Sequence, residues 1–304
     1  MLAVTNGPKT TAPRGLNALS FDIEDYFQVQ ALSSAYPREI WNACESRVER
    51  NTDELLDILT EAKTHATFFT LGWIAERHPK LIRKIVAQGH ELASHGYAHF
   101  RVDQQSPSEF RADIRQAKRL LEDCAGVEVS GYRAATFSIG PNTLWAFPIL
   151  EEEGYRYSSS INPVKHDLYA FPDAPRFAFR PAGTSKLWEF PVSTVRIGNR
   201  NWPCGGGGYF RLMPYLLFRT VLRRVSERDR RPIVFYLHPW EVDPAQPRPS
   251  GITLKSRTRH YLNLNRTANR LARLLNDFRW DRLDRVFRVL TEQHEVPLSH
   301  YERD

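Results

Sequence analysis

The sequence contains little cysteine and no long apolar run, and both shortages narrow the classes of protein that it can encode. Of 304 residues only three are cysteines, Cys44, Cys124 and Cys204, and they are widely spaced, with no CxxC pair. Isolated cysteines in odd number indicate neither a disulfide framework nor a zinc knuckle, and they suit a reducing compartment. No stretch approaches the roughly 18 consecutive apolar residues of a membrane-spanning helix. Residues 1–18 also lack the apolar core of a signal peptide, so we expect a soluble, cytoplasmic protein.

Charge is unevenly distributed along an otherwise ordinary composition. The chain is 25% charged and 41% hydrophobic, which predicts a folded globular protein. Its net charge of +7 comes largely from an arginine cluster after residue 210, formed by Arg223, Arg224, Arg228, Arg230 and Arg231. We interpret the cluster as a solvated helical face, because acidic residues interrupt it. No nucleic-acid motif accompanies it, so no nucleic-acid partner is expected, whereas peripheral membrane association stays open.

From residue 16 onward, short apolar runs alternate with amphipathic segments, the pattern of an α/β protein built from βα units. Asn51 is placed as the N-cap of the first helix. About seven repeats favour a barrel, in which reacting groups gather at the C-terminal ends of the strands. Strands are predicted at 16–22, 66–71, 90–94, 129–133, 155–160, 187–192 and 233–238, and helices at 51–63, 79–88, 108–124 and 142–153.

The chain divides into three expected regions. Residues 1–15 are predicted to be a flexible N-terminus, and residues 16–245 the (β/α) barrel, with inserts at 162–186 and 199–214. Residues 246–304, rich in Arg and Leu, are predicted to form a helical extension that packs on the barrel. The four consecutive glycines 205–208 allow close approach of the backbone to another group. A phosphate-binding loop is not indicated, because no GK[ST] follows them.

Several polar residues fall at predicted strand ends. His95 and His99 are four residues apart, a spacing that on a helical turn would let both imidazoles grip one divalent cation. Asp22, Glu24 and Asp25 end the first strand, with Asp22 and Glu24 on the same side of an extended chain. Such residues can also be caps or turn residues, but their shared position favours a metal site.

Two further residues complete a set suited to hydrolysis. His238 ends an apolar strand and, with a carboxylate partner, could act as a general acid; the alternative is a core histidine bonded to backbone. Arg133 could orient a carboxylate through a bidentate contact, or form an ordinary surface salt bridge. Together these groups suit metal-assisted attack of water on a stable bond.

Six ordered elements over residues 19–243 carry a family resemblance. The sequence resembles the NodB-homology polysaccharide deacetylases, the family 4 carbohydrate esterases, and most of all their branch associated with exosortase and exopolysaccharide gene clusters. The elements are FDIEDYF (21–27), SHGYAH (94–99), GYRAATFSI (131–139), WEFPVS (188–193), GGGYFR (206–211) and YLHPWE (236–241). The resemblance implies an irregular (β/α)7 barrel and removal of N-acetyl groups from an acetamido-sugar glycan or its precursor.

The resemblance also implies roles for individual residues. Asp22 would be the general base, tethered by Arg133, and His238 the acid that protonates the leaving amine. Glu189 lies where the family often has an aspartate that holds this histidine. His95 and His99 would bind Zn²⁺, Co²⁺ or another divalent ion.

The third metal ligand would be Glu24 or Asp25, with Glu24 preferred for its strand phase. A backbone N–H near Thr136 would stabilise the oxyanion, although Ala135 replaces the usual proline and loosens this turn. Tyr209, Phe210, Trp188 and Trp240, with Trp202, could support sugar rings. An amidase for a small non-sugar amide and a non-catalytic glycan-binding barrel are the alternative functions.

Overall fold

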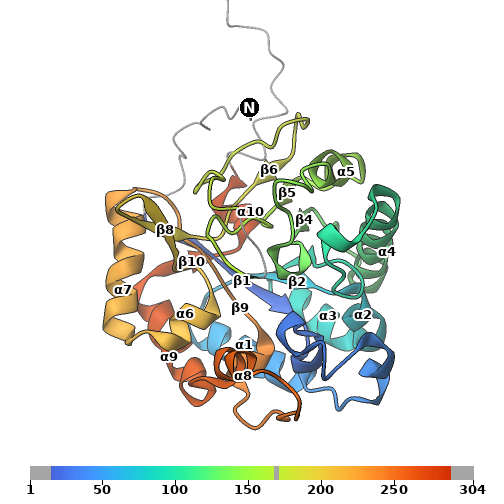
Figure 1. Ribbon diagram of the computed structural model, residues 1–304, viewed down its shortest axis with the longest axis horizontal. Helices are drawn as coiled ribbons and strands as arrows, with labels where there is room; N and C mark the ends of the chain where they lie inside the picture. Colours follow the sequence, from blue (N-terminus) through green and yellow to red (C-terminus); the bar gives the residue numbers. More distant parts are fainter. Residues whose placement is uncertain (1–14, 168–170, 289–304) are drawn as a thin grey trace, which may run out of the picture.

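Parallel strands form the centre of the computed structural model, which describes residues 15–167 and 171–288 (Figure 1). Seven of them lie in the order β9-β1-β2-β3-β4-β5-β6, and the short β10 pairs with the first residues of β1. The strands are β1 (Leu16–Ile23), β2 (Thr67–Thr70), β3 (Glu91–Ser94), β4 (Gly131–Tyr132), β5 (Tyr157–Ser158), β6 (Trp188–Glu189), β9 (Val234–Leu237) and β10 (Arg279–Asp281).

The two ends of the curled sheet meet through backbone hydrogen bonds. Ser193 N donates to Val234 O over 3.1 Å, and Tyr236 N donates to Gly205 O over 2.8 Å, so the segments that follow β6 pair with β9. A separate antiparallel hairpin, β7 (Thr194–Ile197) and β8 (Arg200–Pro203), lies between these contacts in sequence. The expected parallel, barrel-like α/β fold is confirmed.

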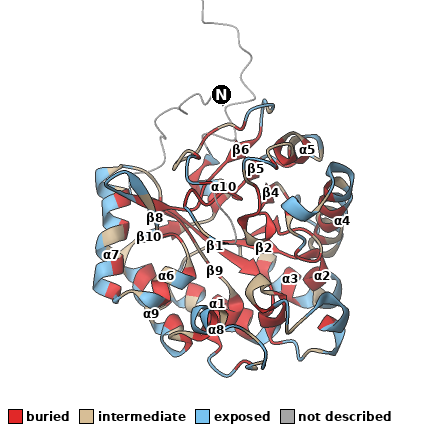
Figure 2. Ribbon diagram, viewed as in Figure 1, coloured by how far each residue is buried: buried red, intermediate tan, exposed pale blue. Residues whose placement is uncertain are grey.

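Most helices cover the outside of the sheet, with buried inward faces and exposed outer faces, whereas α10 packs against the inner cluster (Figure 2). No helix in the described part of the chain is long and apolar enough to span a bilayer. The helices are α1 (Val48–Glu61), α2 (Gly72–Arg77), α3 (Pro79–Ala87), α4 (Pro107–Ala125), α5 (Ala146–Glu152), α6 (Gly207–Leu212), α7 (Tyr215–Arg223), α8 (Leu254–Tyr261), α9 (Thr267–Asp277) and α10 (Leu283–Val286).

The core has an outer and an inner layer because strand side chains alternate between the two faces. In β1, Leu19, Phe21 and Ile23 belong to the large cluster between sheet and helices. Ala18 belongs to the smaller inner cluster, which Phe287 and α10 help to form. Asp22 has the same strand phase as Ala18, so its carboxylate faces the interior of the barrel at the C-terminal end of β1.

Two sequence predictions about local structure are wrong. Asn51 is not an N-cap, because α1 already begins at Val48; it lies buried within the helix, where its amide donates to Asp243 over 3.4 Å. The spacing of His95 and His99 does not arise from a helix either. Residues 95–99 form a loop in which Gly96 and His99 have left-handed backbone angles, with φ of 75° and 54°.

The C-terminal region contributes more than helices. Residues 246–288 contain α8, α9 and α10, as the sequence predicts, but also β10, which pairs with β1 inside the main sheet. Arg279–Asp281 is only three residues long, so the alternation of charged residues with Trp280 is too short to predict a strand. The remainder of the predicted extension, 289–304, and residues 1–14 of the predicted flexible N-terminus lie outside the described residues.

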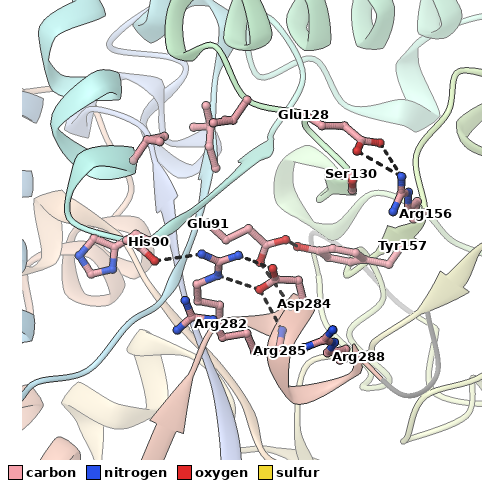
Figure 3. Close-up of a pocket in the computed structure, with 14 residues that line it drawn as sticks. His90, Glu91, Glu128, Ser130, Arg156, Tyr157, Arg282, Asp284, Arg285 and Arg288 are labelled. Atoms are coloured by element: carbon pink, nitrogen blue, oxygen red, sulfur yellow. Dashed lines mark hydrogen bonds and ion pairs between the residues drawn. The ribbon is translucent and has the colours of Figure 1, made fainter. Parts of the chain in front are cut away.

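A cavity of about 490 Å³ lies where β3 and β5 begin, and Glu91 and Tyr157 line it (Figure 3). Neither His95 nor His99 is among its lining residues. Glu91 is buried beside it and accepts hydrogen bonds from Tyr157 Oη (2.8 Å), Thr67 Oγ1 and Asp284 N (3.3 Å). Burial, followed by the charge of Asp284, raises the pKa of Glu91 to about 8.

Stability should therefore depend on pH through Glu91. The folded chain keeps this carboxyl protonated where the unfolded chain ionises it, so its contribution falls as pH rises from about 5 to 8, by at most about 1.4 kcal/mol per pH unit. We predict that Glu91→Gln flattens the pH dependence of the free energy of unfolding, measured by urea titration at several pH values. Glu128→Gln, on the exposed rim of the same cavity, is the matched control. Equal slopes for wild type and Glu91→Gln would contradict the prediction.

Candidate active site

A buried ion pair joins β1 to the end of β4. Arg133 follows β4 and is fully buried, and its Nη1 donates to Asp22 Oδ1 over 2.6 Å. The other donors of the guanidinium bond Ser20 Oγ, Ser159 O and Ser159 Oγ over 2.9 to 3.0 Å. Its plane lies over the Phe69 ring, 4.0 Å from the centroid. Arg133 is thus a buried orienting residue for Asp22, and the surface salt bridge considered from the sequence is excluded.

Glu24, His95 and His99 form a cluster with the composition of a metal site. One ligand atom from each lies within 4.8 Å of the others, and all three side chains are buried. Glu24 Oε2 lies 2.9 Å from His99 Nε2, in a geometry that makes no hydrogen bond. His95 Nδ1 lies 2.8 Å from the Arg133 carbonyl oxygen, which can accept its proton and leave Nε2 as the ligand atom. A buried carboxylate oxygen without a donor and two histidines are a suitable set for a divalent cation.

The protonation states within this cluster favour metal binding. Burial alone would raise the pKa of Glu24, but the charges of the neighbouring histidines, His99 first, outweigh burial and hold the pKa at about 2. Burial lowers the pKa of His95 to about 4, which leaves its imidazole neutral at neutral pH. An ionised carboxylate and a neutral imidazole are the forms that bind metal ions.

Asp25 lies outside this cluster and bonds the backbone at the start of α1. Its Oδ2 accepts hydrogen bonds from Arg47 N (2.7 Å), Val48 N (3.0 Å) and Ser46 Oγ (3.0 Å), and its Oδ1 accepts one from Tyr26 N (2.9 Å). These donors occupy the carboxylate and place its charge at the N-terminus of the helix, where a negative charge is stabilising. Of the two carboxylates considered, Glu24, preferred for its strand phase, lies with the two histidines, while the oxygens of Asp25 are engaged by other donors.

His238 lies beside the cluster and is held by Glu241. Its Nδ1 lies 2.9 Å from Glu241 Oε1, while its Nε2 lies 3.5 Å from Glu24 Oε1 and 3.9 Å from Asp22 Oδ2. Glu241 Oε2 in turn accepts a hydrogen bond from the buried Arg211 over 2.7 Å. Burial lowers the pKa of His238, but Glu241, Glu24 and Asp22 more than offset it, so the net shift is upward.

The expected partner of His238, Glu189, lies elsewhere. Glu189 Oε1 accepts hydrogen bonds from Ser160 N (2.9 Å) and Ile161 N (2.8 Å), so this carboxylate caps backbone groups after β5. Because its neighbours Trp188 and Phe190 belong to the inner cluster, strand alternation turns Glu189 to the outside of the barrel. The sequence did contain the right signal, since Glu241 follows His238 by three residues within YLHPWE.

The glycine run makes room for this arrangement. A Cβ at Gly207 would lie 2.0 Å from Glu241 Oε2, and one at Gly205 would lie 2.5 Å from the Val234 carbonyl oxygen. The backbone of the glycine run therefore approaches β9 and the Glu241 carboxylate closely, as the run of glycines predicted.

The residues predicted to contact substrate occupy different environments. Thr136, with φ of 55°, and Tyr209 are partly exposed. Phe210 is fully buried and packs 5.1 Å from Phe218 and 5.3 Å from Phe235 between ring centroids, so its predicted role as a sugar platform is wrong.

Two of the three predicted tryptophans, Trp188 and Trp240, are buried as well, whereas Trp202 on β8 is 49% exposed. Trp188 lies in the inner cluster formed with α10, so it is not a platform at the site. Trp240 stacks between His238 and His260, at 4.9 and 4.1 Å between ring centroids, and its Nε1 donates to Glu24 Oε1 over 3.3 Å. Trp240 therefore lies beside the cluster of Glu24, His95 and His99 and orients the Glu24 carboxylate.

Comparison with known families agrees with this geometry. The profile of the polysaccharide deacetylases matches residues 35–157, and that of a domain of unknown function, DUF3473, matches residues 159–288. Residues 35–157 are thus a polysaccharide deacetylase domain. The second match crosses the boundary predicted at residue 245.

Curated relatives match only part of this chain. A chitooligosaccharide deacetylase of Bradyrhizobium sp. (strain ANU 289) is 32% identical over 88 residues, which are 29% of this chain and 40% of the relative. One from Sinorhizobium fredii is 34% identical over 100 residues, 33% of this chain and 44% of the relative. A peptidoglycan-N-acetylglucosamine deacetylase of Bacillus cereus is 32% identical over 71 residues, 23% of this chain and 33% of the relative. The chain thus spans less than half the length of these relatives.

A solved structure from Mycobacterium smegmatis, titled a putative polysaccharide deacetylase, covers nearly the whole of this chain. The match extends over 99% of both chains, with a TM-score of 0.63 and 19% sequence identity. At this identity the likeness shows the shared fold.

The two acidic neighbours should respond oppositely to neutralisation. We predict that Glu24→Gln lowers the affinity for Zn²⁺ or Co²⁺ by about tenfold or more, because it removes a charged ligand atom. Asp25→Asn should instead lower the free energy of unfolding by about 1 kcal/mol through its weakened cap, with the metal affinity retained. Metal affinity is measured by isothermal titration calorimetry and stability by urea titration. Loss of metal binding in Asp25→Asn, with Glu24→Gln unaffected, would reverse the assignment.

Proposed function

We propose that this protein is a metal-dependent hydrolase that removes N-acetyl groups from an acetamido-sugar polysaccharide or its precursor. The observation that carries the proposal is the meeting of three groups of residues at one end of the barrel: the Glu24, His95 and His99 cluster, the Asp22–Arg133 pair, and His238 held by Glu241. The relatives' names, chitooligosaccharide and peptidoglycan deacetylase, support an N-acetylated glycan as the substrate class.

A divalent ion held by Glu24, His95 and His99, Zn²⁺ before Co²⁺ or another ion, would polarise the amide carbonyl and acidify water. Asp22 is placed to remove the proton from the attacking water. Its Oδ1 is occupied by Arg133, and its Oδ2 faces the same space as His238 Nε2. Arg133 keeps this carboxylate oriented, as a base requires.

His238 would supply the proton for the leaving nitrogen. Glu241 accepts a hydrogen bond from Nδ1 and favours the imidazolium form of His238, which carries a second proton on Nε2, directed toward Asp22 and Glu24. Water adds its oxygen to the carbonyl carbon, the C–N bond breaks, and the nitrogen takes the proton from His238 as acetate and a free amine form. A backbone N–H near Thr136, where the chain turns through a left-handed conformation, would donate to the developing oxyanion.

We also propose a role in exopolysaccharide biosynthesis and a cytoplasmic location. The first rests on the branch-specific elements WEFPVS, GGGYFR and YLHPWE, which lie within the DUF3473 match. The second rests on Cys44, Cys124 and Cys204, all of which are free thiols, as expected in a reducing compartment.

Acetate release is the direct test of this function. The protein loaded with Zn²⁺ or Co²⁺ should release acetate from N-acetylglucosamine oligomers or the cognate polymer. Asp22→Asn should lower kcat by about 10²-fold or more, because it removes the base. Acetate is measured enzymatically and the new amine by fluorescent labelling, with the bound metal quantified in both proteins. No acetate from any acetylated glycan by the metal-loaded wild type would refute the enzymatic proposal and favour a glycan-binding barrel.

The assignment of Glu241 in place of Glu189 predicts a change in the pH profile. Glu241→Gln removes the carboxylate that raises the pKa of His238, so the alkaline limb of kcat/KM should move to lower pH. Glu189→Gln, the matched control, should leave the position of that limb unchanged. A shift in Glu189→Gln and none in Glu241→Gln would return the role to Glu189.

A further inference from the structure

Exposed apolar side chains gather on one edge of the molecule, on α6, α7 and the β7–β8 hairpin. Dispersed apolar residues are normal on a protein surface, but neighbouring ones mark an interaction site. The exposed fractions are 50% for Ile197, 49% for Trp202, 58% for Leu212, 60% for Leu216 and 53% for Leu217.

Arginines accompany these apolar residues. Arg200 lies on the hairpin, and Arg223, Arg224 and Arg228 lie at the end of α7 and in the π-helical turn Arg224–Arg228. All four are exposed, and within residues 15–167 and 171–288 none of them forms a recorded ion pair. Glu227 lies among these arginines. Because four arginines outnumber this one carboxylate, the local charge is positive. We call the five apolar residues and these four arginines the amphipathic surface.

Contacts between the elements make this surface continuous. β7 packs against the turn Arg224–Arg228, and α6 packs against α7. Arg176 ties the two parts together, because its guanidinium donates both to the Thr194 carbonyl of β7 and to Asp229 Oδ2 after the turn. Figure 1 accordingly shows β8 beside α7 at one edge of the molecule, and Figure 2 shows the outer side of α7 exposed.

We propose that the amphipathic surface binds an anionic membrane surface. Leucine, isoleucine and tryptophan side chains can enter the headgroup region while neighbouring arginines contact lipid phosphates. A nucleic acid would use the arginines but would leave the leucines exposed. A symmetric dimer through this surface would bring arginines against arginines and is disfavoured by repulsion.

The surface also borders the site described above. Leu212 directly follows Arg211, the residue that holds Glu241 beside His238. Membrane binding would therefore bring the barrel end close to the bilayer, an arrangement suited to a lipid-linked glycan precursor. This last consequence rests on the proposed function; membrane binding itself does not.

Vesicle co-sedimentation of the full chain tests the proposal. The protein should sediment with vesicles of phosphatidylcholine and phosphatidylglycerol, and only weakly with phosphatidylcholine alone. Arg223→Glu combined with Arg224→Glu should weaken binding by about tenfold or more, and raised salt should weaken wild-type binding. Leu216→Ser combined with Leu217→Ser should also weaken vesicle binding by about tenfold. This loss should be seen at raised salt as well, because it removes apolar contacts.

Matched controls come from α8, which contributes none of the five apolar residues and none of the four arginines of this surface. Leu254→Ser replaces a leucine that is 79% exposed, and Arg257→Glu reverses an exposed arginine; both should bind vesicles as the wild type does. Circular dichroism and metal binding confirm that each variant is folded, independently of acetate release. The proposal is overturned if the wild type does not sediment with anionic vesicles, or if the surface variants bind like the controls. It is also overturned if light scattering shows instead a dimer that Leu216→Ser with Leu217→Ser dissociates.

Discussion

The salt bridge between Arg133 and Asp22 is the interaction on which the site depends. It links the end of β4 to the end of β1 inside the barrel, and the same guanidinium bonds Ser159 after β5. Removing one partner of a buried pair leaves an uncompensated charge, which typically costs about 3–5 kcal/mol. Fold and chemistry therefore use the same contact: it fixes three strand ends relative to one another and leaves one oxygen of Asp22 facing His238.

A second constraint divides the acidic residues after β1. Asp22 and Glu24 share the inward phase of the strand, so one can act on water while the other lies with His95 and His99. Asp25, one residue further, turns outward and caps α1. Adjacent carboxylates in one motif thus acquire separate roles from strand alternation alone. The same alternation separates Glu189 from the site and places Trp188 in the inner cluster.

Much of this organisation was predictable from the sequence. Apolar runs followed by polar residues predicted the parallel strands and their C-terminal ends, and Asp22, Glu24, His95, His99, Arg133 and His238 do lie together there. The predictions failed where contacts between residues far apart in the sequence determine the position of a side chain or strand. Phe210 follows the glycine run but is drawn into the core by Phe218 and Phe235. β10 pairs with the first residues of β1, Leu16–Ala18, before the pairing of β1 with β2 begins, and a run of three residues is too short to predict this strand from the sequence. The sequence did not predict Glu241 as the partner of His238. Glu241 lies only three residues after His238, but the family resemblance indicated Glu189 instead.

Anomalous diffraction from crystals of the zinc-loaded protein, recorded at the zinc absorption edge, tests the central claim most directly. The account predicts one strong peak bonded to Glu24, His95 and His99, at about 2.0–2.2 Å from a carboxylate oxygen and two imidazole nitrogens. Asp25 should keep its contacts with Arg47 and Val48 in the same map. A peak bonded to Asp25, or no peak at the three residues while zinc is bound elsewhere, would contradict it.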